Sequence, residues 1–384
     1  MNILRLIPSL DPRGGGPIEG AHKIDTRLLR MGHRMEVACL DAPGQPWQSS
    51  YPATVHAFGP AKLGYRYSAA LLPWMRANRR RFDAVIVDGL WQYPGLAAWR
   101  ALAGTDTPYF VFTHGMLDPW FKRTYPLKHL KKWLYWPWAE YRVLRDASGV
   151  LFTCEDERRL ARDSFWLYKA NEIVTAFGTD SPPDDNDGHL ASAFIAAHPE
   201  TQGKRLFLYL SRIHEKKGCD LLIDAFAQVA ATDSSLHLVM AGPDQTGWAA
   251  NLKQQAQRLG MADRITWTGM LQGNAKWGAF HAAEVFCLPS HQENFGIVVA
   301  EALGCGKPVL ISDKVNIWRE IEADGAGIVR PDTTEGTVDA LRTWLALSPE
   351  AQDRMRVAGR QCFKNRYRIE QVAADLLSII QART

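Results

Sequence analysis

Short apolar runs alternate with longer segments of helical periodicity along this chain, and that alternation is what most restricts its fold. Seven runs in the first half are typical of strands, at residues 3–7, 36–40, 55–58, 84–87, 109–113, 149–152 and 172–175. Six follow in the second half, at 206–210, 236–241, 265–267, 285–288, 308–311 and 327–329. Strands separated by helices predict parallel sheets covered by helices. The sequence therefore predicts an α/β protein with two doubly wound units.

Length and composition agree with two globular domains. The chain has 384 residues, more than one ordinary hydrophobic core accommodates. Its 46% hydrophobic and 22% charged residues exclude a disordered protein. Residues 180–188 contain two prolines and four aspartates, which is typical of a linker. We expect an N-terminal domain at 1–182 and a C-terminal domain at 183–367.

The cysteines and the charges indicate the compartment and the partners. Six cysteines are scattered without a CxxC pair, as expected for reduced thiols in a cytoplasmic protein. Arg5 interrupts the short apolar start, which argues against a signal peptide, and no apolar run approaches the roughly 20 residues of a membrane span. Residues 1–180 carry 24 Lys and Arg against 17 Asp and Glu. This excess predicts a partner surface on the first half.

Residues 291–301 place two glutamates, Glu293 and Glu301, on either side of a predicted helix start. The helix covers 297–303, and Gly296 stands at or beside its N-terminus, where unpartnered backbone N–H groups favour an anion. The rise of the helix sets the two carboxylates on opposite flanks of that anion. Sugar hydroxyls, a diphosphate and a ribose diol in that order would fit a nucleotide sugar; the alternative is an ordinary core helix between two glutamates. The same candidate donor site includes Asn294, Phe295 and Ile297.

Two cations follow the predicted strand at 206–210. Arg212 and Lys217 lie in a polar turn before a helix that begins near Asp220. Open α/β sheets bind ligands beyond the carboxyl ends of their strands. Positive charge there would stabilise a departing diphosphate. The alternative is a solvated turn, which we prefer for the neighbouring Lys216.

These segments together resemble the retaining glycosyltransferases of family GT4. The resemblance is carried by Ser211, Arg212, Lys217 and Gly218, by the Glu293 and Glu301 pair, and by the sequence Glu-Ala-Leu-Gly-Cys-Gly-Lys-Pro-Val at 301–309. It covers nearly the whole chain and is strongest in the C-terminal half. It implies the GT-B fold, in which two Rossmann-like domains face across a deep cleft, with the donor site in the C-terminal domain and the acceptor site mostly in the N-terminal one. It also implies retention at the anomeric carbon, no metal, and a last helix, about 368–384, that packs back on the N-terminal domain.

In the first half, a glycine-rich loop and one histidine are site candidates. Gly15 and Gly16 follow the first strand and precede a helix expected at 21–31, so backbone could approach a phosphate closely. The resemblance implies that this loop closes over the donor phosphates; the alternative is a flexible connection. His114 follows the strand at 109–113 and matches the acceptor-side histidine of the family, with a positional or hydrogen-bonding role. Asp88, after the strand at 84–87, is a weaker candidate for the acceptor site.

Basic and aromatic residues interleave over 120–142. Such a segment would suit contact with a membrane surface, where lysines meet anionic lipid and tryptophans the headgroup layer. The alternative is an amphipathic helix with aromatics in the core and lysines in solvent. Pro137 interrupts the helical pattern. Both interpretations stay open from the sequence.

The predicted function is transfer of a hexose from a nucleoside diphosphate to a glycan hydroxyl, in polysaccharide or lipid-linked oligosaccharide biosynthesis. Arg212, Lys217, Glu293 and His114 are the candidate catalytic residues. UDP-glucose is the favoured donor and GDP-mannose the second. We expect no cofactor, because cations and backbone dipoles can supply the stabilisation that a metal would, and no carboxylate stands out as a covalent nucleophile. The expected location is the cytoplasm or the inner face of the membrane.

Other classes remain as alternatives or are disfavoured. A nucleotide-sugar epimerase of GT-B fold could share the expected architecture, and a non-catalytic sugar-binding protein is a further alternative. The spacing after Gly14 lacks the dinucleotide fingerprint, which disfavours a nicotinamide oxidoreductase. The near-neutral second half disfavours nucleic-acid binding. Asp185 and Asp187 form a DxD sequence, the metal-binding signature of the other large glycosyltransferase fold, but they follow no apolar strand.

Overall fold

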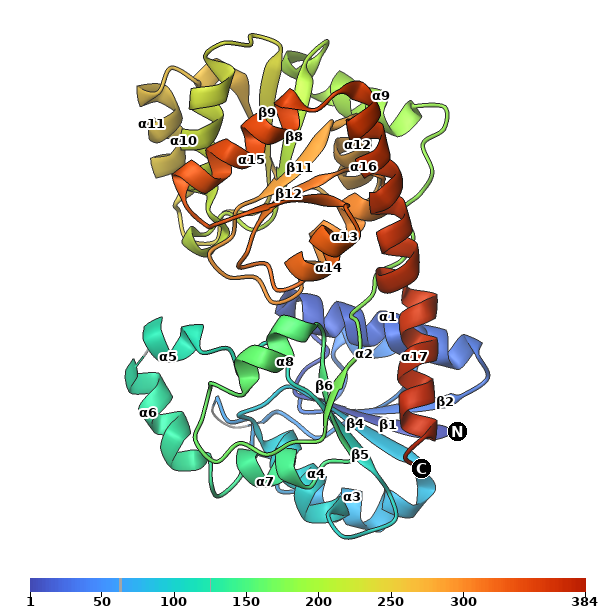
Figure 1. Ribbon diagram of the computed structural model, residues 1–384. Coiled ribbons are helices and arrows are strands. Elements are labelled where there is room, and N and C mark those ends of the chain that lie inside the picture. The colour runs from blue at the N-terminus through green and yellow to red at the C-terminus, as the bar shows by residue number, and fades with distance from the viewer. Residues whose placement is uncertain (62–63, 125) are drawn as a thin grey trace. The chain divides into compact units, whose positions relative to one another are not determined.

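The computed structural model describes residues 1–61, 64–124 and 126–384 (Figure 1). Internal contacts divide the chain into two compact units. Unit 1 comprises Met1–Asp180 and Ile369–Thr384, and unit 2 comprises Ser181–Arg368. The boundary expected between residues 182 and 183 therefore lies two residues further along the chain than the division found. None of the described helices combines the length and apolarity needed to cross a bilayer.

Unit 1 contains a seven-stranded parallel sheet with the order β3-β2-β1-β4-β5-β6-β7. Its strands are β1 (Asn2–Ile7), β2 (Arg34–Cys39), β3 (Thr54–Ala57), β4 (Ala84–Asp88), β5 (Tyr109–Phe112), β6 (Gly149–Phe152) and β7 (Glu172–Val174). Its helices are α1 (Gly16–Arg30), α2 (Pro46–Ser49), α3 (Leu71–Asn78), α4 (Tyr93–Leu102), α5 (Trp120–Thr124), α6 (Pro126–Tyr135), α7 (Glu140–Arg145), α8 (Glu155–Ala161) and α17 (Ile369–Gln381).

Unit 2 contains a six-stranded parallel sheet with the order β10-β9-β8-β11-β12-β13. Its strands are β8 (Arg205–Leu210), β9 (Leu236–Ala241), β10 (Ile265–Gly269), β11 (Val285–Leu288), β12 (Val309–Ser312) and β13 (Gly327–Arg330). Its helices are α9 (His189–Ala197), α10 (Cys219–Ala230), α11 (Ala249–Arg258), α12 (Gly273–Ala282), α13 (Ile297–Gly304), α14 (Trp318–Ala323), α15 (Thr334–Ala346) and α16 (Pro349–Cys362).

The predicted α/β fold with two doubly wound sheets is confirmed. Every predicted strand is present, with bounds within two residues of those expected. Central strands such as β4 and β11 are buried along their whole length, which is why they appear in the sequence as unbroken apolar runs. In unit 2, α10 contacts α11 and α15 in one layer, while α9 contacts α12 and α13 contacts α16 in the other (Figure 1).

The C-terminal helix α17 belongs to unit 1, where it packs against α1 (Figure 1). The Arg27 guanidinium donates to the Asp180 carboxylate at 2.8 Å and forms an ion pair with Glu370, also at 2.8 Å. The N–H of Ile369 donates to the Thr179 carbonyl at 3.0 Å. The chain therefore returns to unit 1 for its last helix.

One carboxyl group in unit 1, that of Glu140, is buried with few hydrogen bonds to stabilise it. Glu140, the first residue of α7, is fully buried. One of its oxygens accepts the N–H of Trp91 at 2.7 Å, and the other has no hydrogen-bond partner in the described part of the chain. Burial raises the pKa of Glu140 to about 8, although the Trp91 N–H and the Lys132 charge act in the opposite direction.

This pKa predicts a stability that falls as the pH rises. Between the unfolded value of 4.5 and about 8 the native state binds more protons than the unfolded state, so the free energy of unfolding decreases with pH across that window. Relative to a Glu140→Gln variant, the wild type should therefore lose several degrees of unfolding temperature between pH 5 and pH 9. Thermal unfolding followed by circular dichroism measures this, with the exposed Glu335→Gln as control. If the difference in unfolding temperature between the wild type and Glu140→Gln stayed the same from pH 5 to pH 9, this would contradict the raised pKa.

Candidate active site

The candidate donor residues of unit 2 gather at the carboxyl ends of two neighbouring strands, β8 and β11. The chain leaves β8 toward β9 and β10 on one side and returns with β11 on the other, so this is the topological switch point of the sheet. Gly218 lets the two loops approach: its φ is +64°, and an added Cβ would lie 2.1 Å from the Pro289 carbonyl oxygen. The segments 211–218 and 289–296 are thereby held together.

Lys217 and Glu293, predicted separately from the two loops, form an ion pair. Their side chains are 7% and 19% exposed, so the pair is largely withdrawn from water. The backbone of Glu293 is also fixed: its N–H donates to Lys314 at 2.9 Å, and its carbonyl accepts the N–H of Asn316 at 3.0 Å. The glutamate thus orients the ammonium group beside the start of α13.

Gly296 lies at the N-terminus of α13, as predicted. It is the N-cap residue, with φ +71°. The Phe295 ring is buried against Tyr367, with ring centroids 5.4 Å apart, so this residue anchors the loop with its side chain. Asn294 accepts a long hydrogen bond of 3.5 Å from Asn316. Within the predicted stretch 294–297, the loop can therefore offer a ligand its backbone groups but not the buried Phe295 ring.

Glu301 lies further along α13 and is 3% exposed. Its carboxylate accepts from the ammonium group of Lys276 on α12 at 2.7 Å. Lys276 also lies over the Trp277 ring, 4.1 Å from its centroid. Lys276 was not predicted as a site residue, since nothing in the sequence around it marks a partner 25 residues away.

Arg212 is exposed at the end of β8, unlike Lys217 in the same loop. Its guanidinium donates to Gln245 at 3.4 Å, a weak contact that leaves the side chain able to move. Its carbonyl accepts the hydroxyl of the buried Tyr209 at 2.8 Å, which fixes the backbone. The structure therefore presents an exposed, weakly held guanidinium on a loop whose backbone is fixed.

In unit 1 the glycine-rich loop is shorter than expected. The helix predicted at 21–31 is α1, and it begins at Gly16. Pro17 stands in its first turn, where a missing N–H costs nothing. Gly15 is the exposed N-cap, with φ +83°. The predicted start of this helix was wrong by five residues, because the glycines were assigned to the preceding loop. Gly15 and Gly16 instead lie at the N-terminus of α1.

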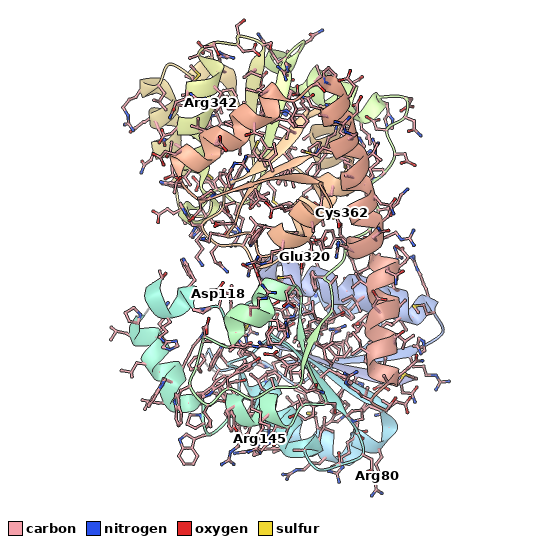
Figure 2. The ribbon with its side chains drawn as sticks, viewed as in Figure 1. Arg80, Asp118, Arg145, Glu320, Arg342 and Cys362 are labelled. Atoms are coloured by element: carbon pink, nitrogen blue, oxygen red, sulfur yellow. The ribbon has the colours of Figure 1, made fainter. Side chains whose placement is uncertain are left out.

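His114 is held rigidly after β5. Its Nε2 lies 2.8 Å from a carboxylate oxygen of Asp88, and its ring stacks on Phe112 with centroids 5.4 Å apart. The following loop is fixed by the buried Glu157, which accepts the N–H of Gly115 at 2.6 Å. From there the loop leads through Asp118 into α5 (Figure 2). In a neutral imidazole whose Nε2 proton is donated to Asp88, Nδ1 is the nitrogen that can act as acceptor.

Behind Asp88 lies a fully buried arginine. Arg5, in the middle of β1, contacts Asp25 at 2.7 Å and Asp88 at 2.6 Å. Burial by itself would raise the pKa of Asp88, but the charge of Arg5 and the bond to His114 hold it below its usual value. Asp25 also accepts the hydroxyl of Tyr51 at 2.8 Å. The position of Arg5, a cation inside an apolar strand, was the sequence signal for this buried network. It was interpreted only as evidence against a signal peptide, so the network was not predicted.

Comparison with known families identifies relatives of this chain. The family model of the group 1 glycosyl transferases matches residues 192–362, and that of a glycosyl transferase 4-like domain matches residues 15–176. The phosphatidyl-myo-inositol mannosyltransferase of Mycobacterium leprae is 30% identical over 99% of this chain and 96% of its own length. The chain belongs to the GT4 glycosyltransferase family.

Other relatives of this chain align over shorter segments. The alpha-D-kanosaminyltransferase of Streptomyces kanamyceticus is 26% identical over 57% of this chain and 56% of its own length. For that enzyme and several other curated relatives, the matched region is about half of the relative's length or less. The structure of Anabaena HepE in complex with UDP and glucose superposes with a TM-score of 0.76 and 18% identity over the full length of both chains. The GT-B fold is thereby confirmed.

The DxD sequence of this chain has a structural role. Asp185 caps α9, accepting the N–H groups of Leu190 at 2.8 Å and Ala191 at 3.0 Å. Asp187 contacts His189 at 2.8 Å. The three side chains of Asp185, Asp187 and His189 offer ligand atoms within 4.8 Å of one another. Because the capping bonds alone explain Asp185, we assign no ion to this cluster.

Proposed function

We propose that this glycosyltransferase moves a hexose from a nucleoside-diphosphate sugar to a glycan hydroxyl with retention at the anomeric carbon and without a metal or other cofactor. The observation that carries the proposal is the set of groups at the ends of β8 and β11. Two cations, a helix N-terminus and two carboxylates occur there together, and the last of these, Glu301, is buried. This is the combination that a diphosphate between two sugars requires.

Each group then has a distinct role. Lys217, oriented by Glu293, and the exposed Arg212 neutralise the charge that grows on the diphosphate as the glycosidic bond breaks. Amides at the start of α13 add fixed dipoles. Glu301 accepts the ribose hydroxyls, and the ion pair with Lys276 holds its carboxylate in position. A metal is dispensable because these charges act in its place.

The transfer takes place on one face of the sugar. The bond between the anomeric carbon and the phosphate oxygen breaks, and the acceptor oxygen forms its bond on the same side. The acceptor's proton passes to the leaving phosphate oxygen, so no carboxylate nucleophile is needed. On the acceptor side, Nδ1 of His114 accepts a hydrogen bond from a sugar hydroxyl and fixes its position.

The donor is UDP-glucose by preference and GDP-mannose second. The UDP and glucose bound to the structurally similar HepE support the first choice, and the mannosyltransferase activity named for the Mycobacterium leprae relative supports the second. The name of that relative also supports a lipid acceptor.

Membrane contact through residues 120–142 forms part of the proposal. Pro137 separates α6 from α7, so the segment is not one helix. Its aromatics divide between the core, where Trp136 is fully buried, and the surface, where Trp138 is 71% exposed. Leu127 and Leu134 are 82% and 62% exposed among lysines, a composition that suits the membrane interface. The enzyme would then work at the cytoplasmic face of a membrane.

Calorimetric titration with UDP, GDP and ADP in the presence of EDTA tests the donor site. We expect micromolar binding of one nucleotide, whose sugar conjugates are then assayed for transfer. Binding that appears only when EDTA is replaced by Mg²⁺ would overturn the metal-free proposal. No binding of any of the three would overturn the donor site itself.

A Glu301→Gln variant tests the ribose contact. Loss of charged hydrogen bonds worth about 1.5–3 kcal/mol should weaken nucleotide binding about 10–100-fold. The exposed Glu322→Gln is the matched control and should bind as the wild type does. Because Glu301 also pairs with Lys276, unfolding temperatures are compared at the same time. Unchanged nucleotide affinity in a folded Glu301→Gln protein would exclude the ribose role.

A further inference from the structure

A groove of about 570 Å³ lies beside α6 in unit 1. Helical spacing places Pro126, His129, Leu130 and Trp133 on one face of α6, and this face forms one wall. The other lining residues are Lys122, Ser164, Phe165 and Trp166. Most of these side chains are aliphatic or aromatic. The volume is that of a ligand pocket, and the lining suits a hydrocarbon.

The wall of the groove is anchored in the core of the unit. Phe165 stacks between His129 and Trp136, with ring centroids 4.6 and 4.5 Å away. Trp136 is fully buried, and its indole N–H donates to the Trp166 carbonyl at 3.0 Å. The groove is therefore a fixed concavity, whereas the exposed Leu127 and Trp138 form no part of its lining.

The groove is positively charged at one place. Lys122 is among its lining residues. The pKa of His129 is lowered by burial and, beyond that, by the charges of Lys122 and Lys132. None of the described lining residues is acidic. An anionic group next to a hydrocarbon chain would therefore be stabilised in this groove.

The groove is connected to the His114 site within the same unit. Trp136 packs on Trp91, with ring centroids 5.9 Å apart. Trp91 lies in the loop that follows β4, and the last residue of that strand is Asp88, the partner of His114. Three aromatic rings, Phe165, Trp136 and Trp91, thus lead from the groove to the loop beside the candidate acceptor site.

We propose that this groove binds the prenyl chain of a polyprenyl-diphosphate-linked acceptor, with the diphosphate at Lys122. The inference rests on the proposed function and specifies its acceptor. A single groove of about 570 Å³ suits one hydrocarbon chain, which favours a prenyl lipid over a two-chain phospholipid. A cation at the groove suits the diphosphate that such a chain carries.

Calorimetric titration of the full chain with geranylgeranyl diphosphate tests the groove. Trp133→Ala and Lys122→Ala should each weaken binding at least tenfold. Trp138→Ala and Lys128→Ala are matched controls, since both lie in the same segment but do not line the groove; they should bind the probe as the wild type does. UDP binding is measured in every variant. Its retention shows that unit 2 is intact, so that a failure of the donor site is distinguished from a failure of the groove.

Further ligands distinguish a prenyl-binding groove from a flat membrane face and from a site for diphosphate alone. Geranylgeraniol should bind less tightly than the diphosphate and should be indifferent to Lys122→Ala, and inorganic diphosphate alone should bind weakly. Equal losses in Trp133→Ala and Trp138→Ala, with matching losses on anionic phospholipid vesicles, would overturn the groove in favour of a flat membrane face. Tight binding of inorganic diphosphate that survives Trp133→Ala would also overturn it, because the chain would then contribute nothing.

Discussion

An Arg212→Ala variant should transfer sugar about 10²–10³-fold more slowly than the wild type, the loss seen when one preorganised stabiliser of transition-state charge is removed. The guanidinium is exposed and makes only a 3.4 Å contact with Gln245, so its removal should leave the fold unchanged. The measurement is the initial rate of transfer from the nucleotide sugar that titration selects, with the unfolding temperature recorded for each protein.

The matched control is Lys216→Ala, the neighbouring cation in the same loop. Its carbonyl accepts the N–H of His291 at 2.8 Å, and this backbone contact survives the substitution. Its transfer rate should stay within a few-fold of the wild type. A fully active Arg212→Ala enzyme would remove Arg212 from the mechanism. Equal losses in the two variants would indicate a general effect of loop charge.

An Arg5→Met variant should lose about 3–5 kcal/mol of unfolding free energy, the usual consequence of leaving buried charge without its partner. Arg5 is fully buried between Asp25 and Asp88, which would then face each other without a cation. Denaturant unfolding measures the loss. Acidification should diminish it, because protonated carboxyl groups no longer need the guanidinium.

Two further sets of variants test whether the buried network of Arg5, Asp25 and Asp88 contributes more to stability than an exposed ion pair does. Arg159, 54% exposed beside Glu155, is the control, and Arg159→Met should cost less than about 1 kcal/mol. Adding Asp25→Asn and Asp88→Asn to Arg5→Met should restore part of the stability. An Arg5→Met protein as stable as the Arg159→Met control would show that the network contributes little.

The strands and the helix starts could be predicted because their signals are local. Fully buried parallel strands such as β4 need apolar residues on both faces, and those runs are visible without any structure. Gly296 could be placed because a helix pattern begins just after it. The start of α1 at Gly16 was not predicted, because glycine and proline occur in loops but are also compatible with the first turn of a helix.

The pairings inside the site depend on contacts between distant segments. Lys217 meets Glu293 only because β8 and β11 are neighbours in the sheet, and Lys276 meets Glu301 only because α12 and α13 converge. Arg5 and Asp88 come from adjacent strands that are 83 residues apart in the chain. A single sequence contains the residue types but not the sheet order that brings them together.

The return of α17 to unit 1 has a consequence for synthesis on the ribosome. Domains usually fold in the order in which they emerge. Here unit 2 is a continuous segment and can complete its fold first, while unit 1 lacks the helix that packs on α1 until Ile369–Thr384 has been translated. A truncated product that ends before this helix leaves α1 uncovered. Loss of the segment Ile369–Thr384 would therefore damage the first domain made rather than the last.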